Sequence, residues 1–154
     1  MSHEDRDRQN SATSAAGSQA EGRSGRLGSD TTTRGIRIQV TSRYLPDRSS
    51  PKEATFLFTY HVHISNVGDE TAQLVSREWI ITNADGEVER VKGPGVVGEQ
   101  PVLTPGAAFE YDSFCPLKTA VGSMHGSYQM VTVGGEKFDA QIQPFTLAVP
   151  NSLN

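Results

Sequence analysis

The feature that most constrains the fold is a strict two-residue alternation of side chains in residues 54–66, ATFLFTYHVHISN. One face of this segment would carry Phe56, Phe58, Tyr60, Val62 and Ile64. The opposite face would carry Leu57, Thr59, His61 and His63. A period of two is typical of a strand that buries one face against a core. The segment therefore predicts a long β-strand in a layered fold.

The same period recurs along much of the chain, and no long window shows the 3.6-residue period of an amphipathic helix. Further strands are expected over residues 34–44, 73–82, 87–92, 107–115, 126–133 and 137–149. Turn residues such as Asn83–Gly86 and Gly134-Gly135 separate several of them. About seven or eight strands with frequent turns predict an all-β fold, an antiparallel sandwich of the immunoglobulin or fibronectin type III kind.

One of these strands carries a charge on its apolar face. In residues 73–82 the alternation puts Arg77 on the same face as Val75, Trp79 and Ile81. An arginine in that position lies at the rim of a core or pairs with an acid in a functional cleft. Both interpretations of Arg77 stay open at the level of sequence.

Residues 1–30 differ in composition from the rest of the chain. Their apolar residues are Met1, Leu27 and four alanines, and they contain no Val, Ile, Phe, Trp or Tyr. Such a segment buries too little surface to offset the entropy lost on ordering. We therefore expect a disordered polar tail over residues 1–30 and one sandwich domain over residues 31–154.

Charge and cysteine content exclude several classes of protein. The net charge is −4 and the sequence shows no basic stripe, so nucleic acid is not an expected partner. The single cysteine, Cys115, allows no intrachain disulfide, which fits a cytoplasmic location. No apolar run approaches the roughly 18–20 residues that span a bilayer, and the charged N-terminus lacks the apolar region of a secretory signal.

Residues 93–98, GPGVVG, match the G-x-G-x-x-G pattern of dinucleotide-binding proteins. That pattern binds pyrophosphate where it follows a buried strand and opens a helix. Here EQPVLTPG follows, and two prolines in eight residues exclude the helix. Two interpretations remain: an anion-binding loop built from Gly93, Gly95 and Gly98 with Lys92 nearby, or glycines that allow positive φ in a connection between sheets.

His61 and His63 are candidate metal ligands. Two residues apart on a strand, they lie on one face about 7 Å apart, a spacing that can hold a divalent transition metal with a third ligand. Cys115 and His125 are the remaining candidates for that ligand. The alternative is a pair of solvent-facing histidines. Clustered carboxylates for magnesium are lacking, and no cofactor is expected.

The sequence offers poor candidates for catalysis. Cys115 lies in SFCPL, whose apolar neighbours indicate a packed thiol rather than a nucleophile. Ser123 in GSMHG lacks the G-x-S-x-G pattern of a nucleophile elbow. We therefore expect a protein that is not an enzyme.

Several motifs in order make the chain recognisable at the family level: WIIT, GVVGEQP, LTPG, CPL, GSMHGSYQM and PFTLAVP. With these motifs, residues 33–150 resemble the ApaG family. The sequence departs from the family pattern at Pro94, where a polar residue is common, and at Phe114, where a small residue is frequent. Within LTPGAAF, Phe109 stands where fibronectin-type sandwiches often have the tyrosine of a sheet-to-sheet corner, and Tyr111 is a candidate to replace its hydrogen bond.

The resemblance implies a fibronectin-like or immunoglobulin-like sandwich with no firmly attached catalytic activity. In bacteria the family is associated with cobalt resistance and magnesium homeostasis, and in eukaryotes a similar domain is an interaction module of F-box proteins. We expect a binding module that engages an unidentified protein partner or a small anion through its loops. The expected contact surface comprises the GPGVVGEQP loop, with Val96, Val97, Glu99 and Gln100, and the neighbouring GSMHG segment with His125. The alternatives are a direct metal-binding protein using His61 and His63 and a pyrophosphate-binding or nucleotide-binding protein using the glycine loop. Exposed edge strands leave the oligomeric state open.

Overall fold

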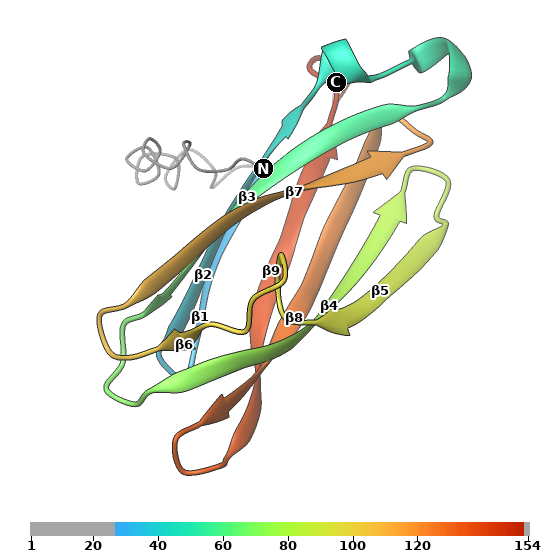
Figure 1. Ribbon diagram of the computed structural model, residues 1–154. Helices are drawn as coiled ribbons and strands as arrows, with labels where there is room; N and C mark the ends of the chain where they lie inside the picture. Colours follow the sequence, from blue (N-terminus) through green and yellow to red (C-terminus); the bar gives the residue numbers. More distant parts are fainter. Residues whose placement is uncertain (1–26, 153–154) are drawn as a thin grey trace.

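The computed structural model describes residues 27–152, which form two antiparallel β-sheets packed face to face (Figure 1). The strands are β1 (Gly28–Thr33), β2 (Ile36–Tyr44), β3 (Phe56–Asn66), β4 (Ala72–Asn83), β5 (Val88–Pro94), β6 (Val102–Leu103), β7 (Ala108–Leu117), β8 (Val121–Thr132) and β9 (Lys137–Ala148). Two short 3-10 helices, η2 (Pro46–Arg48) and η3 (Pro51–Glu53), connect β2 to β3. The prediction of an all-β antiparallel sandwich is confirmed.

The first sheet has the order β1-β2-β3-β7 and the second has the order β5-β4-β8-β9, with the short β6 also paired to β4. Every paired strand is antiparallel to its neighbour. The chain therefore crosses from the first sheet to the second between β3 and β4, returns between β6 and β7, and crosses again between β7 and β8.

Strand β3 confirms the alternation that predicted it. Phe58, Tyr60, Val62 and Ile64 are buried between the sheets, and His61 and His63 are half-buried on the outer face. Because its neighbours β2 and β7 are in register with it, their inward residues extend the same apolar layer.

Two predicted boundaries need correction. Strand β1 begins at Gly28, so the last three residues assigned to the tail belong to the domain, where Asp30 forms an ion pair with Arg37. Residues 1–26, for which disorder was predicted, lie outside the described residues. Strand β8 begins at Val121 rather than residue 126, so GSMHG is part of a strand and not a loop.

A β-bulge in β4 changes which side chains face the core. The register between β4 and β8 shifts between Leu74 and Ser76. Leu74 is consequently fully buried, whereas Val75, predicted to face inward, is 38% exposed. After the bulge, Arg77 pairs with Tyr128, Trp79 with Gly126 and Ile81 with Met124. The bulge thus directs Arg77 and Trp79 into the space between the sheets.

The two sides of the sandwich differ. On one side β1 and β2 lie against β9, and the Ser42 hydroxyl donates a hydrogen bond to the Thr146 carbonyl at 2.7 Å. The opposite edges are β7 in the first sheet and β5 in the second. The segment from β5 to β6, drawn in yellow in Figure 1, contains the GPGVVG motif and lies on this side.

Trp79 is the centre of an aromatic cluster that joins the sheets. Its ring lies 5.3 Å from Tyr60, 6.0 Å from Phe145 and 6.3 Å from Tyr128, each at a steep interplanar angle. Edge-to-face contacts of this kind add to the free energy gained from burying apolar surface.

Asn66 replaces the tyrosine of a sheet-to-sheet corner. Its side chain, buried at the end of β3, donates hydrogen bonds to the Glu70 carbonyl at 2.8 Å and the Leu103 carbonyl at 2.9 Å. Its amide oxygen accepts from the Gly68 backbone amide at 3.0 Å. Tyr111 does not supply the corner bond, because its hydroxyl bonds to the Tyr128 hydroxyl instead.

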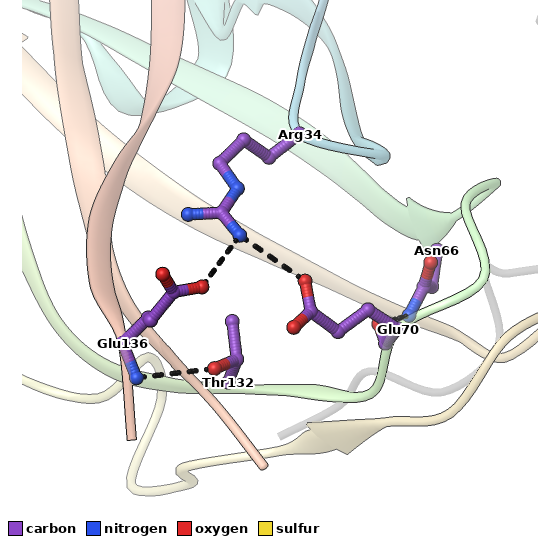
Figure 2. Close-up of polar contacts among 5 residues, drawn as sticks. All are labelled: Arg34, Asn66, Glu70, Thr132 and Glu136. Carbon is purple, nitrogen blue, oxygen red and sulfur yellow. Dashed lines mark hydrogen bonds and ion pairs between the residues drawn. The ribbon is translucent and has the colours of Figure 1, made fainter. Parts of the chain in front are cut away.

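A surface network surrounds the same end of the sandwich (Figure 2). The Arg34 guanidinium pairs with Glu70 at 3.2 Å and Glu136 at 3.0 Å, and it lies 5.0 Å from the Phe138 ring centroid. The network joins the β1–β2, β3–β4 and β8–β9 turns through exposed side chains, so solvent screens it.

Among the described residues, no helix is long and apolar enough to cross a membrane.

We expect Asn66→Ala to lower the free energy of unfolding by roughly 2–3 kcal/mol, because one buried carbonyl, one partly buried carbonyl and one amide lose their partners. Urea denaturation followed by Trp79 fluorescence would measure the change. Arg34→Ala is the matched control at the same end of the fold, and its effect should be much smaller. Equal losses in the two variants would contradict the role assigned to Asn66.

Candidate functional site

A cleft of about 180 Å³ opens between the sheets beneath the GPGVVG loop. Its lining residues come from both sheets and the loop: Tyr60, Arg77, Trp79, Val96, Val97, Tyr111 and Ser113. The aromatic residues and Val96 are buried, whereas Val97 is 57% exposed at the cleft mouth. The lining is largely apolar with a guanidinium and a few hydroxyl groups, the usual composition of a small-molecule site.

Arg77 holds the loop in place from inside this cleft. Its Nη1 donates hydrogen bonds to the Pro94 carbonyl at 3.0 Å and the Gly95 carbonyl at 2.9 Å. No carboxylate within residues 27–152 forms an ion pair with it. The cleft therefore contains a half-buried cation whose charge has no acidic partner in the described chain.

The first two glycines of GPGVVG are explained by close contacts. A Cβ on Gly93 would lie 3.0 Å from both terminal nitrogens of Arg77, so glycine makes room for the guanidinium. A Cβ on Gly95 would lie 2.3 Å from the Glu99 carbonyl oxygen, and its φ is +59°. Gly93 and Gly95 therefore allow a tight loop to pack against Arg77.

A two-residue turn forms the tip of the loop. Val96 and Glu99 exchange backbone hydrogen bonds of 2.9 and 2.8 Å around Val97 and Gly98. The φ values of Val97 and Gly98 are +42° and +82°, as a type I′ turn requires. Glycine and asparagine suit these positions, whereas a β-branched residue such as Val97 is strained there.

The loop offers few donors for the anion site predicted at Gly93, Gly95, Gly98 and Lys92. Pro94 has no N–H, and the amides of Gly95 and Val96 already donate to the carbonyls of Val75 and Glu99. Within the described residues, the amides at the tip without a protein acceptor are those of Val97 and Gly98. Lys92 is exposed on β5 in register with Glu78.

The remaining predicted contact residues of the loop differ in their exposure to solvent and in their hydrogen bonds. Val96 is a buried plug, with 1% of its surface exposed, rather than a contact residue, whereas Val97 and Glu99 are exposed. Gln100 fixes the loop base, because its side chain donates a hydrogen bond to the Val75 carbonyl at 2.9 Å.

His125 is separate from the cleft. It pairs with Ile80 and alternates with the buried Met124, which places it on the outer face of the second sheet. The prediction that His125 and the GSMHG segment join the GPGVVG loop in one loop surface is therefore wrong.

Burial controls the ionisation of the tyrosines around the cleft. It raises the pKa of Tyr128 and Tyr111, whose hydroxyls bond to each other, well above the ordinary value. It also raises the pKa of Tyr60, against a smaller lowering by a hydrogen bond with Ser113. The Arg77 charge lowers all three pKa values but does not outweigh burial. These hydroxyls are therefore protonated at neutral pH.

His61 and His63 lie on the outer face of the first sheet, as predicted, but beside carboxylates. The His61 Nε2 lies 2.8 Å from a Glu110 oxygen and its Nδ1 lies 3.0 Å from an Asp112 oxygen. The His63 Nε2 lies 3.7 Å from the second Glu110 oxygen. Over residues 27–152, no group of three or more potential ligands is arranged to hold a metal ion.

Neither suggested third ligand can join this pair. Cys115 pairs with Phe58 and is buried on the opposite face of the same sheet, while His125 belongs to the other sheet. Burial, with a contribution from Glu89, also raises the pKa of Cys115 to about 12. The thiol is therefore protonated at neutral pH.

Sequence reasoning missed Tyr60, Tyr111 and Ser113 as site residues. They share no local motif, because the register of β3 and β7 places Tyr60 opposite Ser113 and Val62 opposite Tyr111. The one local sequence signal for this site was the position of Arg77 on an apolar strand face beside Trp79. That position indicated either a cleft or the rim of the core.

Comparison with known proteins identifies relatives over most of the described domain. Residues 46–132 match the family profile described as the ApaG domain. A Protein ApaG of Anaeromyxobacter sp. (strain K) is 57% identical over 122 residues, 79% of this chain and 96% of that protein. A Protein ApaG of Acidovorax sp. (strain JS42) is 54% identical over 112 residues, 73% of this chain and 82% of the relative. The crystal structure of an ApaA protein from Bordetella pertussis has a TM-score of 0.75 at 43% identity, covering 79% of this chain and 99% of that one.

Two glycines of the loop should respond differently to the same substitution. Gly95→Ala introduces a Cβ 2.3 Å from backbone, whereas a Cβ on Gly98 meets no atom within 4 Å. Gly98→Ala should cost about 1 kcal/mol because of its positive φ alone. Gly95→Ala should cost distinctly more, measured by urea denaturation. Equal costs would show that the Gly95 contact is relieved without consequence.

The buried tyrosines predict a loss of stability in alkali. Their pKa values are raised in the folded state, so the folded chain retains protons that the unfolded chain releases above about pH 10. Their contribution to stability is full below that pH and declines as the pH rises further. Urea denaturation between pH 8 and 11.5 should show this decline, and it should be shallower in Tyr128→Phe, which has one fewer ionisable hydroxyl. Parallel pH profiles for the two proteins would contradict the assignment.

Proposed function

The chain belongs to the ApaG family, and on that basis we propose that it is a non-enzymatic binding module. Its site is the cleft beneath the GPGVVG loop, which takes a small anionic ligand or an anionic group of a protein partner. The family resemblance supports a cytoplasmic role in a pathway that affects cobalt tolerance and magnesium homeostasis.

The observation that carries this proposal is the position of Arg77. A guanidinium has five N–H donors, and only Nη1 has protein acceptors among the described residues. Partial burial of a charge without an opposite charge is unfavourable, so a fold that retains one gains free energy when an anion binds beside it.

The strained residue at the cleft mouth supports the same site. Val97 has a φ of +42° and is 57% exposed, so neither backbone preference nor burial favours valine there. Strained residues concentrate at ligand-binding and catalytic positions. An apolar side chain at the mouth contributes a contact surface for the bound group.

The state of Cys115 supports a binding role over catalysis. Its thiol is buried, its pKa is raised to about 12, and its hydrogen bond goes to the Pro116 carbonyl at 3.8 Å. A cysteine nucleophile requires a lowered pKa and an adjacent base.

An amide NMR titration of the full chain would test the site. The anionic probes are pyrophosphate and benzoate, and at least one of them should cause saturable shifts at residues 95–98 and 113; benzyl alcohol and benzylamine are the uncharged and cationic controls. Val97→Asn should weaken this binding while raising the free energy of unfolding by up to about 1 kcal/mol, because asparagine tolerates positive φ. A stability gain accompanied by weaker binding separates a functional residue from a structural one.

Val88→Asn is the matched control, since Val88 is 61% exposed on β5 and outside the cleft lining. Expressed in a bacterial strain that lacks its own copy of the family, Val97→Asn should also restore growth on cobalt less well than Val88→Asn. Absence of loop shifts with both anionic probes, or binding unchanged by Val97→Asn, would contradict the proposed site.

A further inference from the structure

The chemistry of the cleft defines its ligand more narrowly than the proposed function on which this inference rests. Its residues come from Tyr60 and Ser113 on the first sheet, Arg77 and Trp79 on the second, and the GPGVVG loop. None of the lining residues is acidic. In a chain of net charge −4, the one charged group of this cleft is a cation.

The Arg77 guanidinium is fixed before any ligand arrives. Nη1 is held by the carbonyls of Pro94 and Gly95, and the missing side chain of Gly93 lets the group lie against the backbone. Nη2 and Nε have no acceptor among the described residues. A planar guanidinium held at one nitrogen offers its other donors at a fixed spacing that suits a carboxylate.

Hydroxyl groups provide a second set of donors within the same cleft. Tyr60 and Ser113 are directly opposite each other in the β3–β7 pairing, and both line the cleft. The Tyr60 hydroxyl is protonated at neutral pH, as an ordinary tyrosine is, and burial raises its pKa further. Tyr111 is already engaged with Tyr128. The hydrogen bond between Tyr60 and Ser113 uses one of their two hydroxyl protons, so an anion beside Arg77 can accept one hydroxyl hydrogen bond as well as those of the guanidinium.

The cleft volume limits the ligand to a small molecule, and charge favours a carboxylate over pyrophosphate. The cleft volume of about 180 Å³ lies below the roughly 300–1,000 Å³ of drug-sized and cofactor sites. Pyrophosphate carries several negative charges, and a single arginine offsets one of them. The rings of Trp79 and Tyr60 and the side chain of Val97 provide apolar surface for the rest of a small ligand.

We infer that the cleft binds a carboxylate carried by a small apolar group, with Arg77 and one hydroxyl of the Tyr60–Ser113 pair contacting the carboxylate. The group belongs either to a free organic acid or to a peptide, as a chain end or an acidic side chain. Arg77 is then the residue that determines specificity for charge, and Val97 contacts the apolar part.

A matched ligand series tests the inference on the unaltered chain. Benzoate, benzyl alcohol and benzylamine share a phenyl ring and differ in charge. Benzoate should bind at least tenfold more tightly than either of the others, with amide shifts at residues 95–98 and 113. N-acetyl-glycyl-phenylalanine, its C-terminal amide and N-acetyl-glutamate amide distinguish a free acid, a chain end and a side chain as the source.

The variants assign the effect to Arg77. Arg77→Gln should lose at least tenfold in benzoate affinity, and Arg77→Lys should recover part of it. Arg90→Gln is the matched control, because Arg90 is 56% exposed on β5 and pairs with Glu78 away from the cleft. Unchanged amide shifts of Gly95 and Val96 would show that the loop survives the substitution.

Each outcome has a distinct meaning. Binding of pyrophosphate tighter than that of benzoate would overturn the carboxylate inference and leave the proposed anion site intact. Equal binding of benzyl alcohol, or benzoate binding that is unaffected by Arg77→Gln, would overturn the inference together with the charge preference on which the proposed function rests. Failure of every probe to shift residues 95–98 and 113 would overturn the inference together with the proposed function.

Discussion

The β-bulge at Val75 is the constraint on which the site depends. Without it, the alternation that buries Leu74 would also bury residues 76 and 78 and turn Arg77 and Trp79 outward. With it, Trp79 enters the aromatic cluster and Arg77 enters the adjoining cleft. The Val75 carbonyl at the bulge also accepts hydrogen bonds from the Gly95 amide and the Gln100 side chain. One irregular residue therefore positions both the cation and the loop that it holds.

The GPGVVG motif illustrates how one glycine pattern serves different physical needs. In a dinucleotide fold, the glycines let backbone approach a pyrophosphate at the start of a helix. Here the first glycine lets backbone approach the Arg77 guanidinium, and the second lets it approach the Glu99 carbonyl. In both settings the absence of a Cβ lets the glycine backbone come close to another group. The glycine pattern indicates that the backbone lies close to another group, and the surrounding strands determine which group that is.

The sandwich itself could be predicted from sequence because alternation is a local signal. Strand β3 follows it through eleven residues, and its buried and outer faces are those expected. The irregular places could not be predicted, since Leu74 and Val75 are both apolar and nothing local indicates where a bulge falls. The same reason explains the error at GSMHG, where glycines suggested a loop. Gly126 lies within β8, where a Cβ would come within 2.0 Å of the Glu78 carbonyl oxygen.

The cleft escaped prediction because pairing across β3 and β7 creates it, and pairing is a property of segments about fifty residues apart. What the sequence did contain was a conflict, an arginine on a face of apolar residues. Such a conflict between local pattern and charge is expected where function overrides packing. The structure resolves it only in part: two carbonyls hold one nitrogen of Arg77, and the rest of the guanidinium faces a cleft without an acid. Backbone carbonyls offer partial charges, so they fix the orientation of the guanidinium without neutralising it. On the proposed function, an external anion completes this arrangement.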